Sequence, residues 1–153
     1  MIQFLHIFLI IPLLLAGCIP SSDKVEINDA YMFVTPKIFP AAAIFMTISN
    51  GTGESDRLID FKTNRAGRAE LHTMTTENDV MKMRRVEGYD LPSSEDNTVY
   101  TLSPMGNHIM VFDIVSDFTE DEEFQGLAVF ENAGEVPVTV QVKSRKNINK
   151  HNH

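Results

Sequence analysis

Two histidines and two methionines in the middle of the chain are residue types that can bind a soft metal ion. They are His72, Met83, His108 and Met110, and they follow the pattern H-x10-M-x24-H-x-M. Imidazole nitrogen combined with thioether sulfur suits Cu(I), because soft sulfur donors select that ion. All four ligands are neutral when bound, so the site keeps the single positive charge of the ion and favours reduced copper. The four residues are therefore a candidate Cu(I) site.

Methionine is concentrated in the same stretch, which holds five of the chain's eight: Met74, Met81, Met83, Met105 and Met110. Methionine is also a flexible gap filler, so the alternative interpretation is that these side chains pack in a core. Strand alternation favours the metal site, because His108 and Met110 would point to one face of an extended strand and Ile109 to the other. The same alternation places Met81 and Met83 on a shared face.

The N-terminal segment has the pattern of a bacterial secretion signal. Residues 2–17 contain no Asp, Glu, Lys or Arg, and the stretch from Phe4 to Leu15 is nearly all apolar. That length is typical of a secretory h-region and is short of the roughly 20 apolar residues of a membrane span. The stretch ends in Leu15-Ala16-Gly17-Cys18, which resembles a lipobox, so we expect cleavage and lipidation at Cys18. An uncleaved apolar anchor is the alternative, and both place the remaining chain outside the cytoplasm.

The expected organisation is a single folded domain between the signal and a polar tail. The boundaries are 1–17 for the signal peptide, 18–24 for the lipidated cysteine and its tether, 25–142 for the domain and 143–153 for the tail. The tail is rich in Lys, Arg, Asn and His and cannot bury a core, so it is predicted to be disordered. Its His151 and His153 are candidate ligands for a secondary metal ion, with an idle chain end as the alternative.

The domain is predicted to be all-β, because short β-rich runs alternate with turn residues. These runs are Val25 to Val34, Ala43 to Ser49, Leu58 to Lys62, Ala69 to Met74, Val80 to Val86, Thr98 to Leu102, His108 to Ile114, Leu127 to Glu131, and Val136 to Val142. Such spacing indicates a sandwich or a barrel. The acidic run Glu120 to Glu123 is expected to be a solvated loop.

Charge and motif content argue against several classes of function. The net charge is -8, which disfavours nucleic acid as a partner. A blue-copper electron carrier needs a cysteine ligand, and the one cysteine lies in the lipobox. The sequence has no H-E-x-x-H motif, nucleophile elbow or glycine-rich phosphate loop, so we do not expect an enzyme.

Three segments resemble the periplasmic copper chaperones of the PCuAC type. They are Ala69 to His72, Val80 to Arg84 and Leu102 to Met110, and the likeness extends over roughly Val25 to Val142. The resemblance implies a cupredoxin-like Greek-key β-sandwich or barrel in which His72, Met83, His108 and Met110 hold Cu(I). Family members commonly place about 21 residues between the second and third ligands, and we expect the extra length in the turn-rich segment 88–97, where insertions cost little.

The resemblance also implies delivery of copper toward cytochrome oxidase subunit II, directly or with a Sco-type thiol protein. The alternative function is a lipid-anchored β-sandwich lipoprotein that binds proteins or serves surface structure without a metal. Ile19 follows Cys18 where an inner-membrane retention signal would typically have Asp, which slightly favours the outer membrane. In a Gram-positive host the anchor would lie on the outer face of the cell membrane.

Overall fold

The computed structural model describes residues 23–34, 40–93 and 99–145. These residues form ten strands: β1 (Val25–Phe33), β2 (Ala41–Asn50), β3 (Asp56–Lys62), β4 (Ala66–Glu77), β5 (Val80–Val86), β6 (Tyr89–Leu91), β7 (Val99–Leu102), β8 (His108–Ile114), β9 (Glu123–Phe130) and β10 (Gly134–Lys143). The predicted all-β class is confirmed, and each predicted run overlaps a strand. The described residues contain no helix long and apolar enough to cross a membrane. Within the turn-rich segment 88–97, residues Tyr89 to Leu91 form strand β6.

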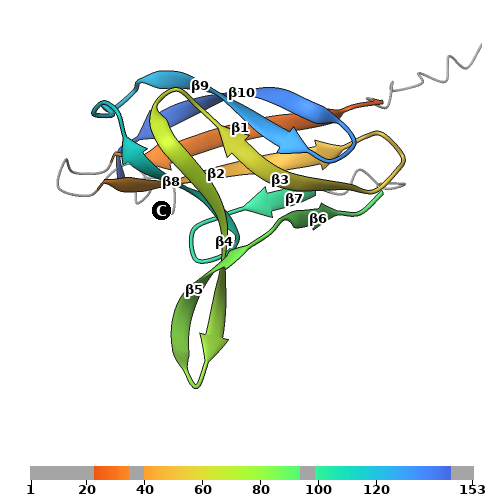
Figure 1. The fold of residues 1–153 in the computed structure, drawn as a ribbon, viewed down its shortest axis with the longest axis horizontal. Helices are drawn as coiled ribbons and strands as arrows, with labels where there is room; N and C mark the ends of the chain where they lie inside the picture. Colours follow the sequence, from red (N-terminus) through yellow and green to blue (C-terminus); the bar gives the residue numbers. More distant parts are fainter. Residues whose placement is uncertain (1–22, 35–39, 94–98, 146–153) are drawn as a thin grey trace, which may run out of the picture.

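The described strands belong to one curled sheet with the order β5-β4-β8-β2-β1-β10-β9-β3-β6, and β7 pairs with β2 beside β8. Strand β1 runs parallel to β10, whereas the other pairings given for these strands are antiparallel. The sheet folds back on itself into the two layers of a sandwich (Figure 1). This arrangement brings β4 and β8 side by side, which positions the two central histidines.

Alternating residues of the strands fill the space between the layers. On β8, Ile109 and Val111 are buried in the core, as the alternation of the sequence predicts. Two methionines outside the candidate site, Met32 and Met46, are buried in the same core. Burial of this apolar surface is the main favourable term in folding, at roughly 25 cal/mol per Å². Packing is therefore the right interpretation for Met32 and Met46.

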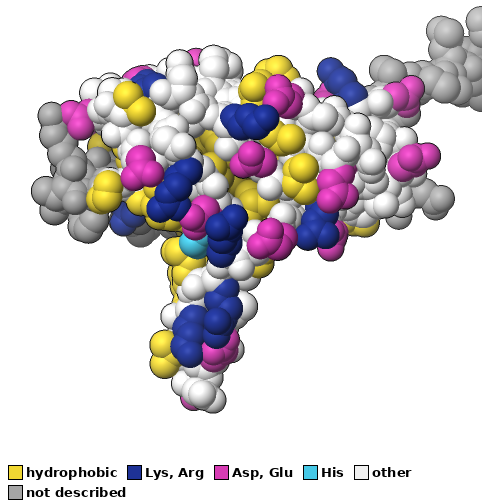
Figure 2. Space-filling view, viewed as in Figure 1, with side chains coloured by type: hydrophobic (Ala, Val, Ile, Leu, Met, Phe, Trp, Pro, Cys, Tyr) yellow, Lys and Arg dark blue, Asp and Glu magenta, His cyan; other side chains and the backbone are white. Residues whose placement is uncertain are grey.

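The outer half of β4 and all of β5 form a hairpin that projects from the sandwich (Figure 1). Strand β4 pairs with β8 only as far as His72, and its following residues pair with β5 alone. We call residues 73–86 the arm. Its two-residue turn consists of Asn78 and Asp79, both with positive φ, as a type I′ hairpin turn requires. Figure 2 shows hydrophobic side chains along one flank of the arm and charged side chains along the other.

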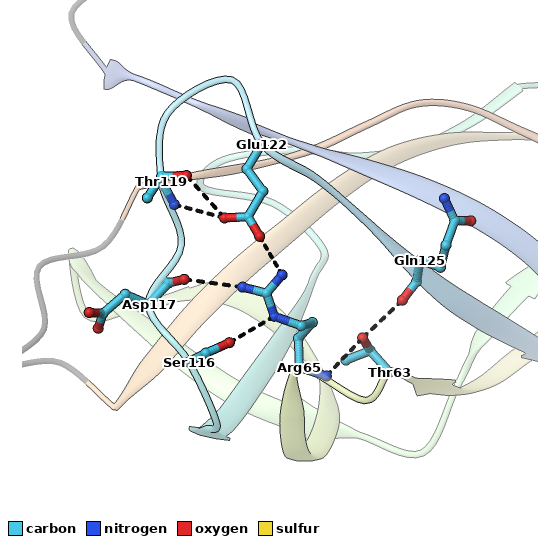
Figure 3. A network of polar contacts seen from close by, with 7 residues as sticks. All are labelled: Thr63, Arg65, Ser116, Asp117, Thr119, Glu122 and Gln125. Carbon is cyan, nitrogen blue, oxygen red and sulfur yellow. Dashed lines mark hydrogen bonds and ion pairs between the residues drawn. The ribbon is translucent and has the colours of Figure 1, made fainter.

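Arg65, in the turn just before β4, ties the β8–β9 connection to the sandwich (Figure 3). The Arg65 guanidinium binds the Glu122 carboxylate, donates to Ser116 Oγ at 3.0 Å and donates to the Asp117 carbonyl at 3.1 Å. It also lies over the ring of Phe118, 4.7 Å from the centroid. Glu120, Asp121 and Glu123 are exposed, as the predicted solvated loop requires, whereas Glu122 is a partly buried ion-pair partner of Arg65.

Candidate functional site

The two central histidines are direct neighbours across strands β4 and β8. His72 and His108 are cross-strand partners at the end of the β4–β8 pairing, where the arm leaves the sandwich. Their ring centroids are 6.0 Å apart, with 43° between the ring planes. Cross-strand partners project from the same face of a sheet, so the structure brings the two imidazoles together as the candidate site requires.

Each imidazole uses one ring nitrogen in a hydrogen bond and leaves the other without a partner. His72 Nε2 lies 2.8 Å from Glu70 Oε2, and His108 Nδ1 lies 2.9 Å from the carbonyl oxygen of Gly106. In the described part of the chain, His72 Nδ1 and His108 Nε2 are the buried side-chain nitrogen or oxygen atoms that lack a hydrogen-bond partner. Buried polar atoms are rarely left unpaired, so these two call for an explanation.

The hydrogen-bond partners determine which nitrogen carries the proton. A carboxylate and a carbonyl only accept, so His72 donates through Nε2 and His108 donates through Nδ1 in the neutral imidazoles. The unpartnered His72 Nδ1 and His108 Nε2 then carry lone pairs. A histidine that binds a metal has this arrangement, with its other ring nitrogen donating to a carboxylate or a backbone carbonyl.

Burial keeps the second histidine neutral. Desolvation lowers the pKa of His108, and the neighbouring His72 lowers it further, against a smaller opposing effect of the hydrogen bond to Gly106. Hydrogen bonding to His72 lowers the pKa of the Glu70 carboxyl, as does the charge of Arg68. Glu70 therefore remains a carboxylate that can orient His72, while His108 presents an uncharged ligand nitrogen.

A tyrosine hydroxyl holds the backbones of the two histidines at their junction. Tyr89 Oη lies 2.6 Å from the His72 carbonyl oxygen and 2.8 Å from that of His108, and it accepts from the His108 backbone N–H at 3.2 Å. Burial raises the pKa of Tyr89, so the hydroxyl keeps its proton at physiological pH. Tyr89 thus fixes the point at which β4 separates from β8.

The two candidate methionines lie on the same face as the histidines, on either side of His72. Met110 follows His108 by two residues on β8 and is diagonal to His72. Met83 lies on β5 opposite Met74, which makes it the diagonal neighbour of His72 on the arm side. Diagonal positions have Cβ atoms about 7–8 Å apart, within reach of long side chains. The structure therefore brings the histidines together directly and places one thioether on each side.

Aromatic rings surround the histidine pair. Phe45 lies 6.3 Å from His108 and Phe112 lies 6.3 Å from His72, measured between ring centroids. The Arg68 guanidinium lies 4.0 Å from the centroid of Phe112 and also binds Glu70. This shell keeps water from the unpartnered nitrogens and fixes the carboxylate that orients His72.

Several sequence expectations concern other places in the chain. Met105 is exposed at the tip of the turn before β8, outside the histidine-bearing strands. Cys18, His151 and His153 lie outside the described residues. Glu70 was not among the predicted site residues, although its position two residues before His72 on the same face was a usable signal. Tyr89 was not predicted either, and no local signal in the sequence indicates it.

The sequence matches the model of the LpqE-like family, described as "Putative lipoprotein LpqE-like", over residues 25–142. The protein RP573 of Rickettsia prowazekii (strain Madrid E) is 27% identical over 139 residues, which cover 85% of this chain and 76% of that protein.

Two solved structures share the fold. The copper-bound PCuAC domain from PmoF2 aligns with a TM-score of 0.66 and 23% identity, covering 79% of this chain and 93% of that domain. The solution structure of Cu(I)-DR1885 from Deinococcus radiodurans aligns with a TM-score of 0.60 and 23% identity, covering 78% of this chain and 77% of that protein. The expected cupredoxin-like architecture of the PCuAC type is confirmed at the level of the fold.

Proposed function

The chain belongs to the LpqE-like family, and from that premise we propose that it is an extracytoplasmic chaperone that binds Cu(I) and passes it on. The observation that carries the proposal is the pair of buried, unpartnered lone-pair nitrogens, His72 Nδ1 and His108 Nε2, on adjacent strands. A metal ion satisfies both atoms at once, which accounts for their burial without hydrogen bonds. The copper-bound PmoF2 domain and Cu(I)-DR1885, which share this fold, support copper as the cargo.

The proposed ligand set consists of His72, His108, Met83 and Met110. Two imidazoles and two thioethers form a soft, neutral set, which discriminates against divalent ions that prefer carboxylates or more nitrogen ligands. No thiolate is involved, so oxidants outside the cytoplasm cannot convert the site to a disulfide. An acceptor with thiolate ligands binds Cu(I) more strongly, so transfer by ligand exchange proceeds toward it. The carrier can therefore both hold and release the ion.

The proposed organisation places the copper domain, residues 25–142, on a lipidated Cys18 at a membrane surface. The family description, which names a lipoprotein, supports the anchor. The copper recipient that we propose is cytochrome oxidase subunit II, reached directly or through a Sco-type thiol protein. His151 and His153 would gather a second ion near the chain end. We also propose that the anchor lies in the outer membrane, or on the outer face of the cell membrane in a Gram-positive host.

A competition titration with bicinchoninate under reducing conditions tests copper binding and its pH dependence. We expect tight binding of Cu(I) at pH 7.5 and weaker binding below about pH 6.5, because protons then compete for imidazole nitrogen. Each histidine ligand can lower the affinity by at most tenfold per pH unit. Because the pKa of His108 is lowered, the decline should be shallow at first and steepen in more acidic solution. Affinity that is constant between pH 7.5 and 5 would exclude histidine ligands.

Glu70 offers a separate test of how His72 is oriented. We expect Glu70→Ala to weaken Cu(I) binding by about 10- to 100-fold, the usual effect of losing the hydrogen-bond partner of a ligand histidine. Glu70→Gln should recover part of the affinity, because its side-chain carbonyl still accepts from His72 Nε2. The measurement is the same competition titration, with Glu77→Ala on the charged side of the arm as the control. Equal affinity of Glu70→Ala and the unmodified protein would contradict the role of Glu70.

A further inference from the structure

The arm has two chemically different faces. Cross-strand pairing puts Met74 opposite Met83 and Thr76 opposite Met81, so the three methionines share one face, which we call the methionine face. The other face carries Glu77, which accepts from Lys82 Nζ at 3.0 Å and from Arg84 Nε at 2.9 Å. The charged groups thus hold the two strands together on the side away from the thioethers.

The methionine face is open to solvent. Met81 is 43% exposed and Met83 is 49% exposed, whereas Met32 and Met46 are almost completely buried in the core. Exposed methionines on a projecting hairpin contribute little to core packing, so the packing explanation that fits Met32 and Met46 does not fit these side chains. Their shared property is an accessible, neutral sulfur atom.

The register brings these sulfur atoms within reach of a single ion. Directly opposed residues, such as Met74 and Met83, have Cβ atoms about 4.5–5.5 Å apart, and diagonal ones, such as Met81 and Met74, about 7–8 Å. Methionine has three rotatable side-chain bonds, so three thioethers at these positions can turn toward one point. Three neutral sulfur donors form a site for a soft monovalent cation and a poor one for harder divalent ions.

We propose that Met74, Met81 and Met83 form a second metal site on the arm, which binds Cu(I) through sulfur alone. Met83 is also the diagonal neighbour of His72, so the two sites share one ligand. An ion on the arm can therefore move inward by ligand exchange: Met83 stays bound while His72 and His108 replace Met74 and Met81. The charge of the ion is unchanged and no proton is transferred to sulfur. This inward step rests on the proposed function, whereas binding on the arm does not.

Silver(I), a soft monovalent ion that does not change oxidation state, is the probe for the arm site. The full chain is labelled with ¹³C at the methionine methyl groups and titrated with Ag(I) while the methyl resonances are followed. We expect the methyl resonances of Met74, Met81 and Met83 to shift together and to saturate at a common ratio of metal to protein. Met105, which is 71% exposed but lies off the arm, is the control and should not move. Met74 and Met81 resonances that stay unshifted at saturating Ag(I), both in the unmodified protein and in one that lacks the two histidines, would overturn the proposal.

Two sets of variants separate this site from the histidine site. In a His72→Ala, His108→Ala protein we expect one Ag(I) to remain bound, with unchanged shifts of Met74 and Met81. Adding Met74→Leu and Met81→Leu, which preserve side-chain volume, should abolish that remaining binding, because two of the three sulfur ligands are lost. Loss of all binding in the histidine variant, with its fold intact by circular dichroism, would overturn the arm site. If Ag(I) shifts the Met74 and Met81 resonances of the unmodified protein and leaves that of Met110, the labelled ligand beside the histidines, unaffected, the proposed function fails and the arm site stands.

If the histidine variant does not fold, the unmodified protein at pH 5 serves instead. Protons compete with metal for imidazole nitrogen as the pH falls, while thioether sulfur has no competing proton, so the arm should retain its Ag(I). Loss of the Met74 and Met81 shifts at pH 5 would again overturn the arm site.

Discussion

The His108→Ala protein is expected to lose Cu(I) affinity by more than about 100-fold. Loss of the hydrogen-bond partner of a ligand histidine costs about 10- to 100-fold, and loss of the ligand itself should cost more. The side chain supplies an unpartnered nitrogen and lies beside His72, so the variant loses one of the two imidazole ligands. Met83→Ala should also reduce copper loading. Its effect should be smaller than that of His108→Ala, because Met74 offers a thioether directly opposite.

Both variants are expected to remain folded. The core face of β8 is formed by Ile109 and Val111, which point away from the site, and Met83 is half exposed on the arm. Circular dichroism and thermal unfolding measure the fold, and bicinchoninate competition measures the affinity. Met105→Ala is the matched control, because Met105 is an exposed methionine outside the ligand set. If the His108→Ala protein and the Met83→Ala protein both fail to fold, the two side chains serve core packing rather than metal binding.

Features that arise from neighbouring residues of one strand were predictable from the sequence, whereas contacts between distant residues were not. Strand alternation predicted that His108 and Met110 share a face with Ile109 opposite, and the bounds of β5 and β8 match the predicted runs. The pairing of His72 with His108 joins residues far apart in the chain, so only the family resemblance suggested it. Strand β6 was missed because three residues give too short a pattern, and its partner β3 lies some thirty residues earlier.

The groups that prepare the histidines were even less visible in the sequence. His108 is oriented by a backbone carbonyl, that of Gly106, and any residue at that position has one. Tyr89 reaches the site from β6 through its hydroxyl, and only the tertiary structure places it between the backbones of the two histidines. Long-range contacts of this kind leave no periodic signal. Residue types therefore indicated the chemistry of the site, whereas its preorganisation emerged only from the fold.

Arg65→Ala is expected to lower the free energy of unfolding by about 3 kcal/mol, the order that follows from losing several charge-assisted hydrogen bonds at a partly buried site. The guanidinium binds Glu122, Ser116 and the Asp117 backbone, and it stacks on Phe118 (Figure 3). Removing it leaves the Glu122 carboxylate without its cation. The loss corresponds to a fall in Tm of about 10 °C for a domain of this size.

The exposed pair of Lys62 and Glu135, with N and O atoms 2.8 Å apart, provides the control for Arg65→Ala. Both side chains of this pair are about half exposed and screened by solvent, so Lys62→Ala should destabilise the protein much less than Arg65→Ala. Chemical denaturation of both variants gives the two free energies. A smaller loss for Arg65→Ala than for Lys62→Ala would show that the network in Figure 3 is not a stabilising anchor.

Acid should remove part of the contribution of Arg65, and the sign follows from Glu122. Hydrogen bonding to Arg65 lowers the pKa of the Glu122 carboxyl in the folded protein, and the Thr119 backbone N–H lowers it further. The folded state therefore holds this carboxylate charged at a pH where the unfolded chain has already bound a proton. The resulting stability is complete above the ordinary glutamate pKa of about 4.3 and is lost as the pH falls through the lowered value.

The difference in unfolding free energy between the unmodified protein and Arg65→Ala should accordingly be largest near neutral pH and shrink below about pH 4. A difference that stays constant down to pH 3 would mean that Arg65 stabilises the fold through its contact with Phe118 rather than through its ion pair.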